Sequence, residues 1–203
     1  MLSSVFGVLG GLVAVSGNVP YIAETVKGKT KPRLVTWLTW TLLTALASAA
    51  AFSDHQIAAG SFALLGTLAT GTILVIGWRY GDRSFGRLDI ACLVGVIIGL
   101  MAWLLLNTPA IGVWAAIIID CIGLIPTIRH AWQAPAEETP STYILVCIGG
   151  MMAVAAVAAT GQISVTAIGY PLYTAVSLGA VGAIVLLRRR PKAVTNPAEA
   201  ADE

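Results

Sequence analysis

Seven long apolar runs, separated by short connections, dominate this sequence. They are Leu2–Val26, Leu34–Phe52, Ile57–Trp78, Leu88–Leu106, Ala110–Trp132, Tyr143–Ala159 and Ile163–Leu187. A helix needs about 20 mostly apolar residues to cross a membrane, and these runs approach or exceed that length. Helices are the expected spanning element, because lipid offers no partners for open backbone groups and these runs are too long for the strands of a barrel. The sequence therefore predicts an all-α integral membrane protein with seven transmembrane helices.

The low charge content excludes a soluble fold. Hydrophobic residues make up 57% of the chain and charged residues only 11%, whereas a soluble domain carries about 25% charged residues. The net charge of +2 is also too small to indicate a nucleic-acid partner. This composition predicts that membrane lipid surrounds the protein.

The basic residues fall on alternate connections, which predicts the orientation of the helices. The first, third and fifth loops and the C-terminus hold all of them: Lys27, Lys29, Lys31, Arg33, Arg79, Arg83, Arg87, Arg129, Arg188, Arg189, Arg190 and Lys192. Because Lys and Arg are retained on the cytoplasmic side, the N-terminus is expected outside and the C-terminus inside.

The two ends of the chain align at a shift of 106 residues. Gly17 then falls on Gly123, and Pro20 falls on Pro126. Two three-helix repeats can share one orientation only if a further helix separates them, and the fourth run supplies it. The predicted units are a first repeat (1–80), a linker helix (81–108), a second repeat (109–187) and a disordered cytoplasmic tail (188–203).

This 3+1+3 plan, with a proline in the first helix of each repeat, resembles the SWEET and PQ-loop superfamily. The segments Gly17-Asn18-Val19-Pro20-Tyr21-Ile22 and Asp120-Cys121-Ile122-Gly123-Leu124-Ile125-Pro126 are similar to an uncharacterised bacterial branch. The resemblance implies a transporter of the bacterial inner membrane with a site between the repeats. The sequence departs from the superfamily where Tyr21 and Thr127 follow the prolines in place of Gln. It also has no Asn on the third helix of either repeat, where sugar-carrying members have one.

Asp120 is the residue that most suggests a function, because it lies near the middle of an apolar run. A central carboxylate costs about 2.5–3.5 kcal/mol on insertion scales. It is expected either to contact a solute or couple a proton, or to form a structural hydrogen bond with a neighbouring helix. Gly123 and Thr127 share its helix face and suit the wall of a cavity.

The prolines inside the runs are candidate hinges. Pro20, Pro126 and Pro171 each lack the N–H that would bond the carbonyl four residues earlier. A freed carbonyl is tolerated in a span where it lines a cavity or finds another donor. The alternative is a static kink.

Further polar and aromatic residues complete the candidate site. Besides Asp120, the expected solute-binding residues are Asn18, Trp40, Tyr170 and Tyr173. The expected inner gate consists of Glu24, Arg33, Arg129 and His130. Packing of the aromatic residues and solvation of the charged ones are the alternatives.

A small-solute transporter or facilitator, for a sugar or another small polar metabolite, that alternates between two repeats is the leading functional interpretation. Asp120 is its candidate residue for coupling a proton. The alternative is a membrane receptor or sorting protein on the same fold. Motifs of hydrolases and metalloproteases are absent, so we expect no enzyme, cofactor or metal; a homo-oligomer is left open. Cys92, Cys121 and Cys147 lie in apolar runs and are interpreted as packing residues.

Overall fold

The computed structural model describes residues 2–28, 31–84, 86–136, 138–161 and 163–189. Its elements are α1 (Leu2–Ser16), α2 (Val19–Val26), α3 (Leu34–Ser53), α4 (Ile57–Tyr80), α5 (Arg87–Leu106), α6 (Pro109–Gln133), α7 (Pro140–Ala158), η1 (Val165–Gly169) and α8 (Tyr170–Arg188). Within these residues seven helices are long and apolar enough to cross a membrane. The predicted all-α fold with seven candidate spans is confirmed.

The first span differs from the sequence prediction because it is broken. Helix α1 ends at Ser16, and α2 begins at Val19 with Pro20 in its first turn. Proline is favoured there because the first residues of a helix need no N–H partner. By contrast, α6 continues through Pro126. The two prolines that the repeat alignment pairs therefore have different effects on their helices.

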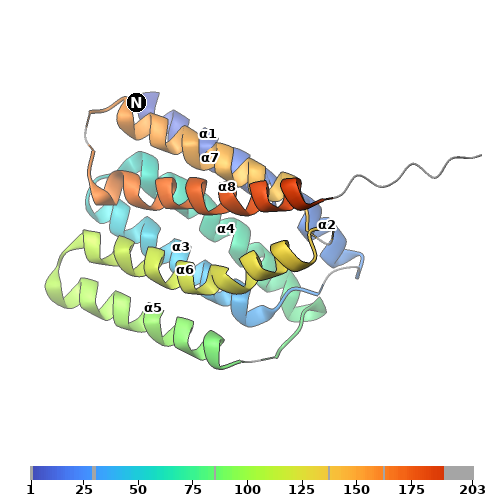
Figure 1. Cartoon of the computed structure of the whole chain (residues 1–203). Helices are drawn as coiled ribbons and strands as arrows, with labels where there is room; N and C mark the ends of the chain where they lie inside the picture. Colours follow the sequence, from blue (N-terminus) through green and yellow to red (C-terminus); the bar gives the residue numbers. More distant parts are fainter. Residues whose placement is uncertain (1, 29–30, 85, 137, 162, 190–203) are drawn as a thin grey trace, which may run out of the picture.

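The helices lie in two rows of three, with α5 outside them (Figure 1). In the first row α4 packs between α1 and α3, and in the second row α8 packs between α6 and α7. Across the rows, α1 contacts α7 and α3 contacts α6. Helix α5 packs against α6 and α3. Helices α2 and α8 terminate at the same end of the bundle. We call it the basic end, because the described Lys and Arg residues belong to segments at this end.

Small residues bring the helix backbones close together. A Cβ on Gly10 would lie 2.6 Å from the carbonyl oxygen of Gly149, so α1 and α7 touch through their backbones. On the other side of the bundle, Gly99 of α5 faces Ala115 of α6. Membrane helices associate through such contacts, because lipid provides no hydrophobic force between them.

The outer surface is apolar. Leu105 on α5, Ile118 on α6 and Val176 on α8 are among many exposed large hydrophobic side chains. A surface of this kind is stable in lipid and not in water. The fold and its surface together indicate an integral membrane protein.

Candidate functional site

Asp120 lies halfway along α6 and faces the other helices. Its helix face includes Ala116 and Ile117, which are buried, whereas Ile118 and Ile122 on the opposite face are exposed. Asp120 itself is half-buried. The Asp120 carboxyl group therefore lies near the middle of the span, on the face of α6 that is turned toward the other helices.

Two predicted residues from other helices meet Asp120. The Trp40 side chain of α3 and the Tyr173 side chain of α8 are its polar neighbours. The Tyr173 hydroxyl is buried, yet its oxygen has no hydrogen-bond partner of ordinary geometry. Tyr170 lies behind Tyr173, with 6.4 Å between the ring centroids. Three helices thus bring Asp120, Trp40, Tyr170 and Tyr173 together, and we call these four residues the central cluster.

Apolar side chains surround the central cluster. Trp40 and Tyr173 pack against a buried core that includes Leu43, Ile117 and Ile119. Such surroundings have a low dielectric, which strengthens every electrostatic interaction with the Asp120 carboxyl group. The cluster therefore has few polar groups, and Asp120 is its one carboxyl group.

Open space lies one helical turn from Asp120, toward the basic end. A Cβ on Gly123 would meet no atom within 4 Å, although Gly123 shares its helix face with the buried Ala116 and Ile119. Thr127 follows on the same face and is half-buried. Two other hollows, one along α4 and one between α3 and α4, are not lined by Asp120 or Gly123. At Gly123, one turn beyond Asp120, α6 thus leaves room for a side chain.

Asn18 lies apart from the central cluster, at the break between α1 and α2. The neighbouring Gly17 carbonyl accepts a hydrogen bond of 2.8 Å from the Thr142 hydroxyl of α7. The break in the first span thus exposes a carbonyl, as the sequence indicated, and a threonine of the second row satisfies it. The sequence pointed to the Ser16 carbonyl, one residue earlier.

The other candidate hinge precedes Pro171. The segment Val165–Gly169 is a single π-helical turn, and Pro171 is buried at the start of α8. Such turns are rare and concentrate at functional sites. Nearby, the Thr166 hydroxyl donates to the Asp54 carboxylate from the α3–α4 connection. This contact joins the rows at the end opposite the basic end, and the sequence analysis did not identify it.

The expected inner gate is divided in the structure. His130 Nδ1 lies 2.7 Å from Glu138 Oε1, and the Tyr143 hydroxyl donates to Glu138 Oε2 over 2.5 Å. Glu24 and Arg129 are exposed at the ends of their helices. Sequence analysis missed Tyr143 as a partner of Glu138.

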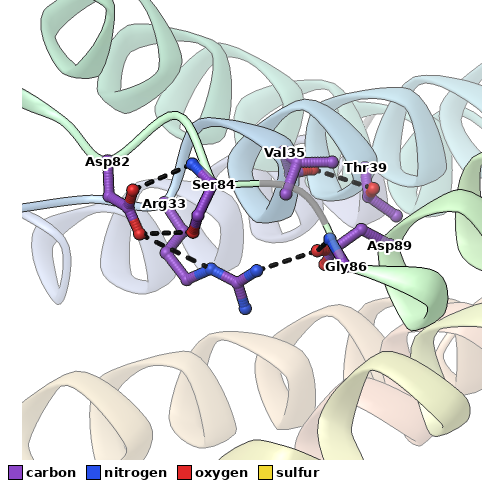
Figure 2. A network of polar contacts seen from close by, with 7 residues as sticks. All are labelled: Arg33, Val35, Thr39, Asp82, Ser84, Gly86 and Asp89. Atoms are coloured by element: carbon purple, nitrogen blue, oxygen red, sulfur yellow. Dashed lines mark hydrogen bonds and ion pairs between the residues drawn. The ribbon is translucent and has the colours of Figure 1, made fainter.

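Arg33 belongs to a separate network at the basic end (Figure 2). Its guanidinium group donates to Asp89 over 2.8 Å and lies 4.0 Å from Asp82. The Ser84 hydroxyl and backbone N–H donate to Asp82, and they lower the pKa of that carboxyl group below its usual value. The network ties the start of α3 to the α4–α5 connection. Arg33 therefore fixes α5 and does not join His130.

These features define an all-helical protein with seven candidate spans and a buried acidic and aromatic cluster midway along them. The described residues contain no group of three His, Cys, Asp or Glu side chains that could hold a metal ion. Comparisons with family models, with curated proteins and with solved structures found no match for this chain.

Proposed function

We propose that this protein is a carrier of small polar solutes that works by alternating access between its two rows of helices. One observation carries the proposal: Asp120 sits at mid-span between the rows, facing Trp40 and Tyr173, with open space beside Gly123. A mid-span carboxylate is costly in a membrane, and such residues mark solute and proton pathways. Asp120 is the group that would contact the solute or carry a coupled proton.

The contact pattern of the helices supports an origin from two repeats. In the two repeats, α1 corresponds to α6, α3 to α7 and α4 to α8. The α1–α7 contact then corresponds to the α6–α3 contact, and both contacts are present. Residues 1–80 and 109–187 are then the repeats, and α5 is the linker. This supports the proposed similarity to the SWEET and PQ-loop superfamily, in which parallel repeats enclose a central site.

The orientation proposed from the basic residues puts the basic end in the cytoplasm. With an odd number of spans, the N-terminus then lies outside and the C-terminus inside. The bacterial inner membrane is the proposed location. The predicted tail lies almost entirely outside the described residues.

Movement between the rows requires contacts that break at one end while others hold at the opposite end. Thr142 and Gly17 join the rows at the basic end, whereas Thr166 and Asp54 join them at the opposite end. The break before Val19 and the π-helical turn before Pro171 are positions where the helices would bend. These contacts and bends, present toward both ends, support the proposed rocking motion.

Uptake by proteoliposomes tests the proposal. The full chain is reconstituted, and uptake of small labelled metabolites is measured with and without a pH gradient. We expect uptake that Asp120→Asn abolishes, while Asp82→Asn in the exposed α4–α5 connection leaves it intact. Unchanged uptake in Asp120→Asn would remove the role of this carboxyl group. Specific binding without any flux would favour the receptor interpretation.

A further inference from the structure

Among the residues that the structure describes, no positively charged side chain adjoins the Asp120 carboxyl group. Its polar neighbours are the neutral side chains of Trp40 and Tyr173, and the described Lys and Arg residues belong to segments at the basic end. A buried carboxylate without a counter-charge is unfavourable, so it is either protonated or neutralised by a cation. The neutralising group is therefore either a proton or a cation from outside the described residues.

The Tyr173 hydroxyl also lacks a hydrogen bond of ordinary geometry. Its oxygen is buried, and its polar neighbours are the Asp120 carboxyl group and the Cys121 thiol. Buried polar groups in folded proteins are nearly always hydrogen-bonded, so an orphaned one needs an explanation. A donor placed between the carboxylate and the hydroxyl would satisfy both groups.

Aromatic rings supply the rest of the surroundings. Trp40 of α3 and Tyr173 of α8 are side-chain neighbours of Asp120, and the Tyr170 ring lies beside the Tyr173 ring. An aromatic ring attracts a cation to its face, and Trp does so most strongly. A neutral sugar needs several polar partners, whereas the core around this cluster consists of residues such as Leu43, Ile117 and Ile119.

We propose that the central cluster binds a small organic cation, with its ammonium group between the Asp120 carboxylate and the Tyr173 hydroxyl and against the ring of Trp40. The inference rests on the proposed function, because it names the class of solute that the carrier would move. The open space beside Gly123 leaves room for the remainder of the molecule.

Binding is tested separately from transport. The purified full chain in lipid nanodiscs is titrated with ethanolamine, choline and glucose at constant ionic strength by calorimetry. We expect both cations to bind and glucose not to bind. Asp120→Asn is expected to weaken both cations by about tenfold or more, since a charge-assisted contact is lost. Asp82→Asn, which removes an exposed carboxylate, is expected to leave both affinities unchanged.

Two further variants report on the geometry. Tyr173→Phe should weaken ethanolamine more than choline, because only ethanolamine has an ammonium N–H to donate to the hydroxyl. Trp40→Leu should weaken choline by about threefold to tenfold, through the lost cation–π contact. Equal loss of both ligands in Tyr173→Phe would overturn the proposed position of the ammonium group.

The outcomes separate this inference from the carrier proposal. Absence of cation binding, or cation binding that persists in Asp120→Asn, overturns the inference whatever the flux measurements give. Uptake of a neutral solute without cation binding overturns the inference and leaves the carrier proposal intact. Cation binding that depends on Asp120 but produces no flux supports the binding site and overturns the carrier proposal.

Discussion

The glycines at the α1–α7 contact should be far less replaceable than the glycine beside Asp120. In Gly149→Ala, the new Cβ would lie 2.8 Å from the Cβ of Ala14 and 2.9 Å from its backbone nitrogen, and closer still to the Gly10 carbonyl oxygen. Backbone atoms cannot turn away as the end of a side chain can, so the helices must separate. Overpacking of this kind typically costs about 1–3 kcal/mol.

Gly123→Ala is the matched control, because it makes the same chemical change within another spanning helix. Its Cβ would meet no atom within 4 Å. Alanine favours a helix over glycine by up to about 1 kcal/mol, and this gain applies to both variants. The difference between the two unfolding free energies therefore isolates the close packing, and we expect Gly149→Ala to be less stable than Gly123→Ala by about 1–3 kcal/mol.

The assay is reversible unfolding of the purified protein in mixed micelles, followed by circular dichroism. Both variants are compared with the parent chain at one detergent composition. Equal stability of the two variants would refute the backbone contact between α1 and α7. A large loss in Gly123→Ala alone would refute the open space beside α6.

Three other measurements follow from the structure. Thr142→Val should lower the free energy of unfolding by about 0.5–1.5 kcal/mol, because the Gly17 carbonyl loses its donor, whereas Thr36→Val, at the equivalent repeat position, should change it less. The pKa of Asp82 is lower in the folded state than in the unfolded state. The ionised carboxylate therefore stabilises the fold above its unfolded pKa of about 3.9, and this stabilisation is lost as the pH falls through the folded pKa. The stability difference between the parent chain and Asp82→Asn should shrink below about pH 4. Gly123→Leu should fill the space beside Asp120 and reduce solute binding or uptake while folding stays intact; retained binding would place the solute elsewhere.

The seven helices could be predicted because a span must satisfy all its backbone groups within one long apolar run. The same reasoning failed at Gly17, where the first span breaks, since the apolar pattern continues through the break. Pro126 stays inside a continuous helix although it aligns with Pro20. Whether a proline ends a helix depends on neighbouring donors such as Thr142, which lies far away in the sequence.

The central cluster was partly predictable for a similar reason. Asp120 was identifiable because a carboxylate is conspicuous among apolar residues, and Trp40 and Tyr173 because they are polar-edged aromatic residues at mid-span. Asn18 is also a polar residue within an apolar run, yet it lies at the α1–α2 break. The position of a residue along its helix does not show which way its side chain faces after the helices pack.

The pairing of Arg33 was not predictable from charge alone. Its partners, Asp82 and Asp89, are fixed by the turn between α4 and α5, where Leu34 N–H bonds the Asp82 carbonyl over 2.9 Å. Charged residues at the basic end have many possible partners, and loop geometry selects among them. His130 and Arg33 were grouped by their depth in the membrane, but loop geometry separates them.

The α1–α7 and α3–α6 contacts between the rows are unequal, and this has a consequence for any route through the protein. Where α1 meets α7, backbone touches backbone, which leaves no width for a passing molecule. A route would therefore run off-centre, along the side formed by α3 and α6. Helix α5 packs against that side. It would therefore form part of the wall of the route as well as linking the two rows.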